Sequence, residues 1–175
     1  MQKNRHRTHL KIIAVWTAVS LILSAMLPAG TSYAAAVPVP SLSKAQLQYA
    51  KIQADNAAQV VKLVNIERQK AGLKPLVVHT NLTKMAKTKV VDMYNHKYFS
   101  HTSPSYGSPF DMMDSFNITF EYAGENLARG QRTPAEVVKD WMNSPDHKAN
   151  MLNPNYTLIG VGYYNGYWSQ EFIGK

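Results

Sequence analysis

Two apolar segments, "YTLIGVGYY" and "YWSQEF", flank the dipeptide Asn165-Gly166 near the end of the chain. This dipeptide between two strand-forming segments is the strongest short-range signal for a β-hairpin, because both residues tolerate the positive φ angles of a tight turn. The pattern predicts two antiparallel strands at the C-terminus. Any fold for this chain must therefore contain an antiparallel sheet.

The segments before the hairpin are mainly helical in pattern. A helix is predicted from Ser43 to about Ala71, polar and loosely packed over residues 43–57 and then apolar at i, i+3, i+4 and i+7 spacing. Gly72 and Pro75 end it. A second helix is predicted from about Leu82 to His96.

Three further helices and one more strand are predicted from local signals. Ser108 caps a short helix, Thr133-Pro134 begins another with a capping box completed by Glu136, and Ser144-Pro145 begins a third. Residues 118–128, "ITFEYAGENLA", resemble a strand that leads into a turn. Helices mixed with antiparallel strands place the domain in the α+β class.

The N-terminus has the three-part pattern of a secretory signal peptide. A basic leader precedes the apolar residues 12–27, and Ser32 and Ala34 are small residues suited to cleavage before Ala35. The apolar run is shorter than the roughly 20 residues that span a membrane, so we expect export rather than an uncleaved anchor. The expected organisation is a signal peptide (1–34), a linker with an N-terminal helical segment (35–57), and a folded domain (58–175).

The charge and composition of the chain limit the classes of binding partner that we expect. The whole chain carries a formal charge of +8, and removing residues 1–34 leaves 15 basic and 11 acidic residues, a charge of +4. No stripe of Lys and Arg with interleaved aromatic residues remains, so nucleic acid is not expected as a partner. The positive charge permits a mild attraction to anionic cell-wall polymers or membrane surfaces. The chain has no cysteine, which excludes disulfides, thiol catalysis and cysteine-ligated zinc.

Three polar residues stand at places that favour chemistry. His101 lies in a loop after a helix, Glu125 follows Gly124 among apolar neighbours, and His147 is the third residue of a helix, whose N-terminus disfavours the imidazolium form. Two neutral imidazoles and one carboxylate suit an open divalent-metal site or general acid–base catalysis. Each could equally be an ordinary hydrogen-bonded structural group, because spacing does not show that they meet.

The neighbouring candidates are weaker. His96 is expected to satisfy carbonyl groups at the end of the second helix, and His79, before the helix cap expected at Thr80 or Asn81, is given no role. Ser100 is not a catalytic partner of His101, because adjacent side chains on an extended chain point apart.

Five motifs in order, "LVNIERQKAGLKPL", "YFSHTSP", "AGENLA", "SPDHKANML" with "NYTLIGVGYY", and "YWSQEF", resemble the CAP superfamily of cysteine-rich secretory, antigen 5 and pathogenesis-related proteins. The similarity is to its secreted bacterial branch of SCP-domain proteins and covers about residues 58–174. It implies a three-layer α-β-α sandwich with a central antiparallel sheet.

The resemblance also implies a cavity lined by two His and two Glu, in which the histidines of some members hold a divalent metal such as zinc. Carried over by motif, these positions are His101, Glu125 and His147, with His101 and His147 as metal ligands. The second Glu would lie three residues after Trp141, where this chain has Ser144. Tight metal binding is therefore in doubt.

The family resemblance leaves three functions open, because a fold does not determine a chemistry. We expect a secreted or cell-wall-associated binding module that holds a lipid, a peptide or a cell-wall fragment. The alternative is a metal-dependent, peptidase-like hydrolase that uses His101, Glu125 and His147. A structural component of the envelope or spore coat is the third.

Overall fold

The computed structural model describes residues 41–175, which belong to one compact unit. The expected signal peptide (1–34) and the start of the expected linker lie outside the described residues. The elements in chain order are α1 (Lys44–Lys70), β1 (Val77–Val78), α2 (Thr80–Asn95), α3 (Pro109–Ser115), β2 (Tyr122–Arg129), α4 (Pro134–Asn143), α5 (Pro145–Met151), β3 (Leu158–Tyr164) and β4 (Tyr167–Gly174).

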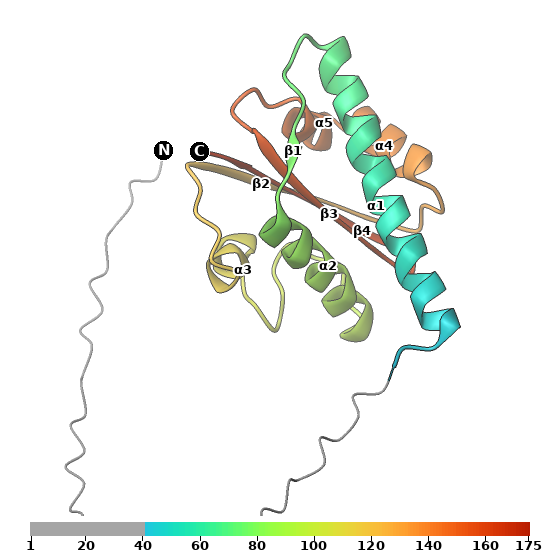
Figure 1. The fold of residues 1–175 in the computed structure, drawn as a ribbon. Helices are drawn as coiled ribbons and strands as arrows, with labels where there is room; N and C mark the ends of the chain where they lie inside the picture. Colours follow the sequence, from blue (N-terminus) through green and yellow to red (C-terminus); the bar gives the residue numbers. More distant parts are fainter. Residues whose placement is uncertain (1–40) are drawn as a thin grey trace, which may run out of the picture. The chain divides into compact units, whose positions relative to one another are not determined.

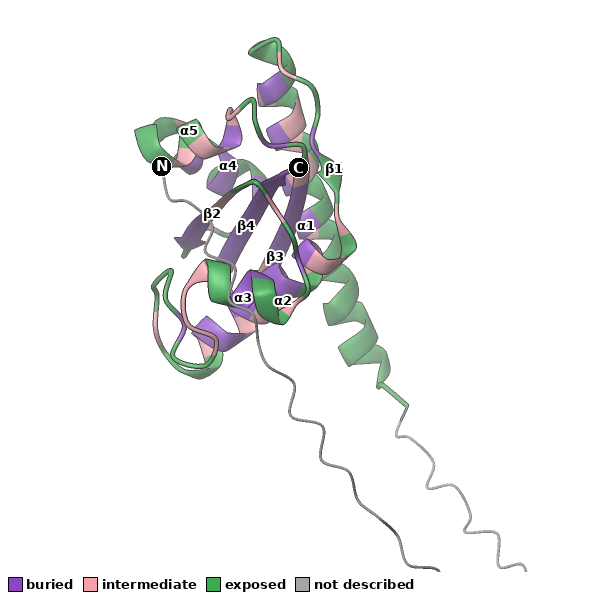
Figure 2. Cartoon of the chain, turned by 90° about the vertical axis from the view of Figure 1, so that its left-hand side faces the viewer, coloured by how far each residue is buried: buried purple, intermediate pink, exposed green. Residues whose placement is uncertain are grey.

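A four-stranded sheet in the order β1-β3-β4-β2 forms the middle of a three-layer α-β-α sandwich. Helices α1, α4 and α5 cover one face and α2 and α3 the other (Figure 1). The buried residues gather on the strands and on the helix faces turned toward them (Figure 2). The predicted fold class is confirmed.

One detail of the sheet differs from the expectation. The two-residue strand β1 pairs in parallel with β3, so the sheet is mixed rather than wholly antiparallel. Strand β1 is too short to show an alternating pattern, and it is recognisable only by its hydrogen bonds to the segment around β3, such as Val77 N to the Thr157 carbonyl at 3.0 Å.

The C-terminal hairpin is as predicted. Strands β3 and β4 pair in antiparallel register from Leu158–Ile173 to Tyr164–Tyr167. The two residues between them, Asn165 and Gly166, have φ angles of 46° and 79°, the positive values of a two-residue turn.

Helix α1 begins where the sequence predicts, with Ser43 and Gln46 forming a capping box. It continues without interruption across residue 57. Residues 41–52 are exposed, and burial against the sheet begins at Ala57 and Val60. The periodic apolar positions therefore mark the packed half of the helix.

Arg68 ties the end of α1 to two loops. Its guanidinium is buried and donates to the carbonyl oxygens of Lys74, Met151 and Asn153, each at 2.9 Å, and of Tyr156 at 3.2 Å. A buried charge needs such partners, because desolvation without hydrogen bonds is costly. Backbone carbonyl partners have no side-chain signal, so the sequence did not reveal this contact.

Helix α2 begins two residues earlier than predicted, at Thr80, and its cap is His79 rather than Thr80 or Asn81. The His79 Nδ1 accepts the Leu82 N–H at 3.3 Å, the contact that a Ser or Asp side chain usually makes. His79 thus has the structural role that the sequence did not assign to it.

The remaining helices follow their local signals. Ser108 and Thr133 cap α3 and α4 through the predicted capping boxes. Ser144 occupies the N-cap position of α5 without a side-chain capping bond, and Pro145 is the first residue of that helix. Among residues 41–175, no helix combines the length and apolar character needed to cross a membrane.

Candidate functional site

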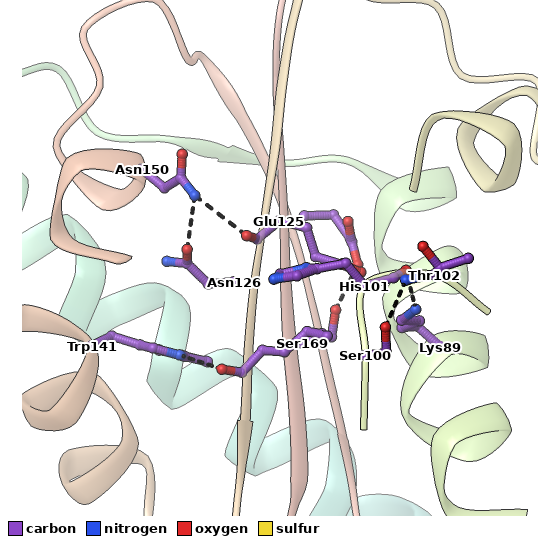
Figure 3. Close-up of polar contacts among 11 residues, drawn as sticks. Lys89, Ser100, His101, Thr102, Glu125, Asn126, Trp141, Asn150 and Ser169 are labelled. Atoms are coloured by element: carbon purple, nitrogen blue, oxygen red, sulfur yellow. Dashed lines mark hydrogen bonds and ion pairs between the residues drawn. The ribbon is translucent and has the colours of Figure 1, made fainter. Parts of the chain in front are cut away.

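His101 and Glu125 are in direct contact. His101 lies in the loop between α2 and α3, and Glu125 lies on the edge strand β2. The His101 Nδ1 is 2.6 Å from the Glu125 Oε1, although 24 residues separate them in sequence (Figure 3). The His101 side chain is 58% exposed and that of Glu125 only 2%, so a buried carboxyl orients a solvent-facing imidazole.

His147 reaches the same region from the opposite face of the sheet. It is the third residue of α5, and its carbonyl accepts the Asn126 amide at 3.0 Å. Glu125 and Asn126 point to opposite faces of β2, and because β2 is an edge strand, residues from both faces can approach each other around it. Burial and the nearby positive charge of His101 lower the pKa of His147.

The neutral form expected for His147 agrees with this direction. Burial also lowers the pKa of His101, and the charge of Lys89 lowers it further. Among residues 41–175, no hydrogen bond joins the His147 ring to His101 or Glu125. The three residues lie in the same region, and of these only His101 and Glu125 are hydrogen-bonded to each other.

Glu171 is a fourth ionisable side chain of this site that sequence reasoning missed. It is fully buried on β4 and directly opposite Glu125 in the sheet register. The Ser169 hydroxyl donates to its Oε1 at 2.5 Å. Strand alternation in "YWSQEF" places Ser169 and Glu171 on one face. The missing information was the register with β2.

The two carboxyl groups interact. Burial raises the pKa of Glu125 to about 7 and that of Glu171 well above its ordinary value, to which the Glu125 charge adds. Within residues 41–175, one oxygen of each, Oε2, is buried without another hydrogen-bond partner. A proton on either carboxyl adds a hydrogen-bond donor to this buried pair, because a protonated carboxyl donates and an ionised one accepts.

Lys89 supplies a buried cation. Its side chain extends from α2, is 1% exposed as a residue, and donates to the His101 carbonyl at 2.6 Å (Figure 3). Burial lowers the Lys89 pKa, while Glu125, Glu171 and Asp92 favour its charged form. Lys89 lies on the buried face of α2, and the tertiary structure shows that it holds the loop of the candidate site.

The remaining polar residues considered from the sequence take part in local structure. His96, expected to close α2, lies with its Nδ1 3.2 Å from the Asp92 carbonyl and 2.8 Å from the Asp92 Oδ1. Ser144 joins α4 to α5, at the position where the family resemblance would place a second Glu. The Glu136 carboxylate accepts the N–H groups of Arg132 and Thr133 in the cap of α4.

The donor set does not match a zinc centre of the usual kind. Catalytic zinc sites use three protein ligands and structural sites four. In the described part of the chain, no group of three or more His, Cys, Asp or Glu side chains is arranged to hold an ion. The Nδ1 of His101 is already bonded to Glu125. The atoms that remain to coordinate a metal are the Nε2 of His101 and the ring nitrogens of His147.

The comparisons with known proteins address the family. The model of the CAP family, described as the cysteine-rich secretory protein family, matches residues 61–173. The chain belongs to the CAP family. It is 59% identical over 119 residues to the uncharacterized protein YkwD of Bacillus subtilis, which covers 67% of this chain and 46% of YkwD.

A second relative in the same organism is the uncharacterized membrane protein YlbC, 36% identical over 128 residues, or 73% of this chain and 37% of YlbC. The chain thus spans less than half the length of either relative. CAP domains can therefore be parts of larger proteins.

Solved structures agree with the fold. An extracellular protein containing an SCP domain, from Bacillus anthracis, superposes with a TM-score of 0.72 at 31% identity, over 78% of this chain and 45% of that one. An outer surface protein of Borrelia burgdorferi gives a TM-score of 0.61 at 23% identity, over 66% and 90% of the two chains. These neighbours are described as extracellular or outer-surface proteins.

Proposed function

We propose that this CAP domain is exported and acts outside the cell as a binding module, with His101, Glu125 and His147 as its ligand contacts. The observation that carries the proposal is the 2.6 Å contact between a buried carboxyl and an exposed imidazole. A side chain held in this way can bind a ligand without first losing rotamer freedom, which is the advantage of a preorganised site.

The composition of the site favours a polar ligand. His101 leaves its Nε2 to solvent, and His147 has a pKa lowered toward the neutral form that both donates and accepts. Two surface hollows of about 510 and 480 Å³ flank the loop of residues 72–77, and neither is lined by these three residues. A peptide or a cell-wall fragment, rich in amide and hydroxyl groups, therefore suits the site better than a lipid chain.

Hydrolysis is the second candidate, and one contact favours it. A carboxyl group that fixes the Nδ1 of His101 leaves the Nε2 as a proton acceptor for a water molecule. The neighbouring hydroxyl of Ser100 accepts the Thr102 N–H at 3.2 Å and, among the described residues, does not bond His101. A hydrolase of this kind would activate a water molecule as the nucleophile and would not use a serine.

The test compares the full chain with the His101→Ala/His147→Ala double variant in binding to purified cell-wall fragments and in cleavage of a peptide library. The control is His79→Asn, which removes an imidazole elsewhere and keeps a good helix cap. We expect the double variant to lose about tenfold or more in affinity for the fragments, equivalent to about 1.4 kcal/mol or more, and the control to lose none.

Zinc content and thermal shifts with zinc or chelator separate the candidates further. Two imidazoles alone predict weak zinc binding or none. Peptide cleavage that the double variant abolishes would replace the binding proposal with the hydrolase. Equal fragment binding by all three proteins, without cleavage, would remove His101 and His147 from the function.

A further inference from the structure

The loop that carries His101 needs an anchor. It joins α2 to α3, and most of its side chains are exposed, including Phe99, Ser100 and His101 itself. The His101 ring is more than half exposed, so side-chain packing alone does not hold it against Glu125. The position of the imidazole depends on the path of the loop backbone.

Asp92, on the last turns of α2, supplies the anchor. Its carboxylate is buried and accepts the hydroxyls of Tyr98 at 2.5 Å, Ser103 at 2.6 Å and Ser105 at 2.9 Å, and it pairs with His96 at 2.8 Å. Two of these partners precede His101 and two follow it. A single carboxylate therefore holds the loop on both sides of the candidate site residue.

The charge state of Asp92 agrees with this role. Burial alone would raise the Asp92 pKa, but the hydrogen bonds from Ser103, Tyr98 and Ser105 outweigh it and hold the pKa below its ordinary value. The Ser103 hydroxyl also accepts the N–H groups of Ser105 and Tyr106, each at 3.0 Å, so the bond to Asp92 also organises the turn after His101.

A second contact comes from the preceding turn of the same helix. Lys89 lies three residues before Asp92 and therefore on the same helix face. Its ammonium group binds the His101 carbonyl at 2.6 Å. Helix α2 thus contacts the loop before, at and after His101, through one anion and one cation.

We propose that Asp92 is the positioning residue of this site, which holds the loop of residues 96–105 so that His101 stays against Glu125. Asp92 acts on a ligand only through His101. The effect on ligand affinity rests on the binding function proposed above, whereas the effect on His101 does not require any ligand.

The experiment observes the His101–Glu125 hydrogen bond in the full chain by NMR. A proton in a contact of 2.6 Å gives a downfield resonance, assigned by its loss in His101→Ala. The main variant is Asp92→Asn, which has nearly the same shape but presents one acceptor oxygen in place of two. The control is Asp111→Asn, which removes a carboxylate that bonds Ser108 in the cap of α3.

We expect the resonance to disappear or broaden in Asp92→Asn and to remain in Asp111→Asn, even if both variants melt at a lower temperature. If the resonance remains in a folded Asp92→Asn variant, Asp92 only stabilises the domain and the proposal is wrong.

A second variant keeps the test decisive if Asp92→Asn does not fold. Tyr98→Phe combined with Ser103→Ala removes two donors and leaves the carboxylate in place. Weakening of the resonance in this double variant supports the proposal, and an unchanged resonance contradicts it. Because no ligand is used, the result is independent of whether the proposed binding function is right.

Discussion

At the residue scale, the most unusual feature is a pair of glutamates side by side in the buried sheet. Glu125 and Glu171 face each other across β2 and β4, and Lys89 is the buried cation near them. Like charges directly opposite in a sheet are unfavourable, and burial makes them more so. Burial and the like charge therefore both favour a protonated form for at least one of the two carboxyls.

This arrangement predicts a pH effect on stability. The Glu171 pKa is raised in the folded protein well above its ordinary value of 4.5. A carboxyl whose pKa is raised by folding makes its full contribution to stability below about pH 4.5. This contribution is lost as the pH rises toward the pKa of the folded state, and the free energy of unfolding falls by about 1.4 kcal/mol per pH unit. Glu171→Gln, which does not titrate, should therefore gain stability relative to the native chain between about pH 5 and pH 7.

Urea unfolding at several pH values measures this difference. The control is Glu121→Gln, which makes the same substitution at an exposed position just before β2. A constant difference for Glu171→Gln over the same range would show that Glu171 does not hold a raised pKa.

At the element scale, the close approach of α2 to β3 determines how the site is built. Gly160 and Gly162 face α2, and a Cβ on either would lie 2.2 Å from a backbone atom of that helix. Because neither glycine has a side chain, α2 lies directly on the sheet. This contact brings Lys89 to the buried glutamates and Asp92 to the loop of residues 96–105. The motif "IGVG" is therefore a packing requirement as well as a strand.

Gly162→Ala should consequently destabilise the domain severely. The added Cβ would meet the Ala86 carbonyl carbon and oxygen, which belong to the rigid helix backbone. We expect a loss of at least about 3 kcal/mol, at the upper end for overpacking, measured by urea unfolding.

Gly72→Ala is the matched control for this substitution. Gly72 has a φ of 73° but no atom within 4 Å of an added Cβ, so its replacement should lose only about 1 kcal/mol through the left-handed conformation. Equal losses at positions 72 and 162 would contradict a steric role for Gly162.

At the scale of the whole molecule, α1 raises the question of where the folded domain begins. The family match starts at residue 61, and the sequence predicted a boundary after residue 57. Yet Ala57 and Val60 lie in the core, and Tyr49 contacts the hairpin through Asn165 and the Tyr164 ring. The first half of α1 is exposed along most of its length but belongs to the same compact unit.

A fragment of residues 58–175 should therefore be less stable than one of residues 41–175. It lacks the Ser43 capping box, the Tyr49 contact and the buried Ala57, which together should contribute about 2 kcal/mol. Urea unfolding of the two fragments measures the loss.

Two substitutions in the longer fragment locate the source of that loss. Tyr49→Ala should reproduce part of it, and Leu47→Ala, at an exposed position, should not. Equal stability of the two fragments would place the domain boundary at residue 57 after all.

The elements of this protein could be predicted from the sequence because their signals are local. The Asn165-Gly166 turn, the caps at Ser43, Ser108 and Thr133, and the stop at Gly72 each depend on residues within a few positions. Local signals failed where an unusual group replaced the common one, as with the His79 cap, or where a strand was only two residues long.

Local sequence patterns thus predicted the class of fold and the hairpin, and the resemblance to the CAP family predicted the candidate site residues. The tertiary structure was needed to show that Glu171 lies beside Glu125, that the His101 ring contacts Glu125, and that Lys89 and Asp92 hold the loop of His101. These relations depend on the register between strands and on the packing of α2 on β3. Such contacts join residues far apart in the chain, and no local pattern encodes them.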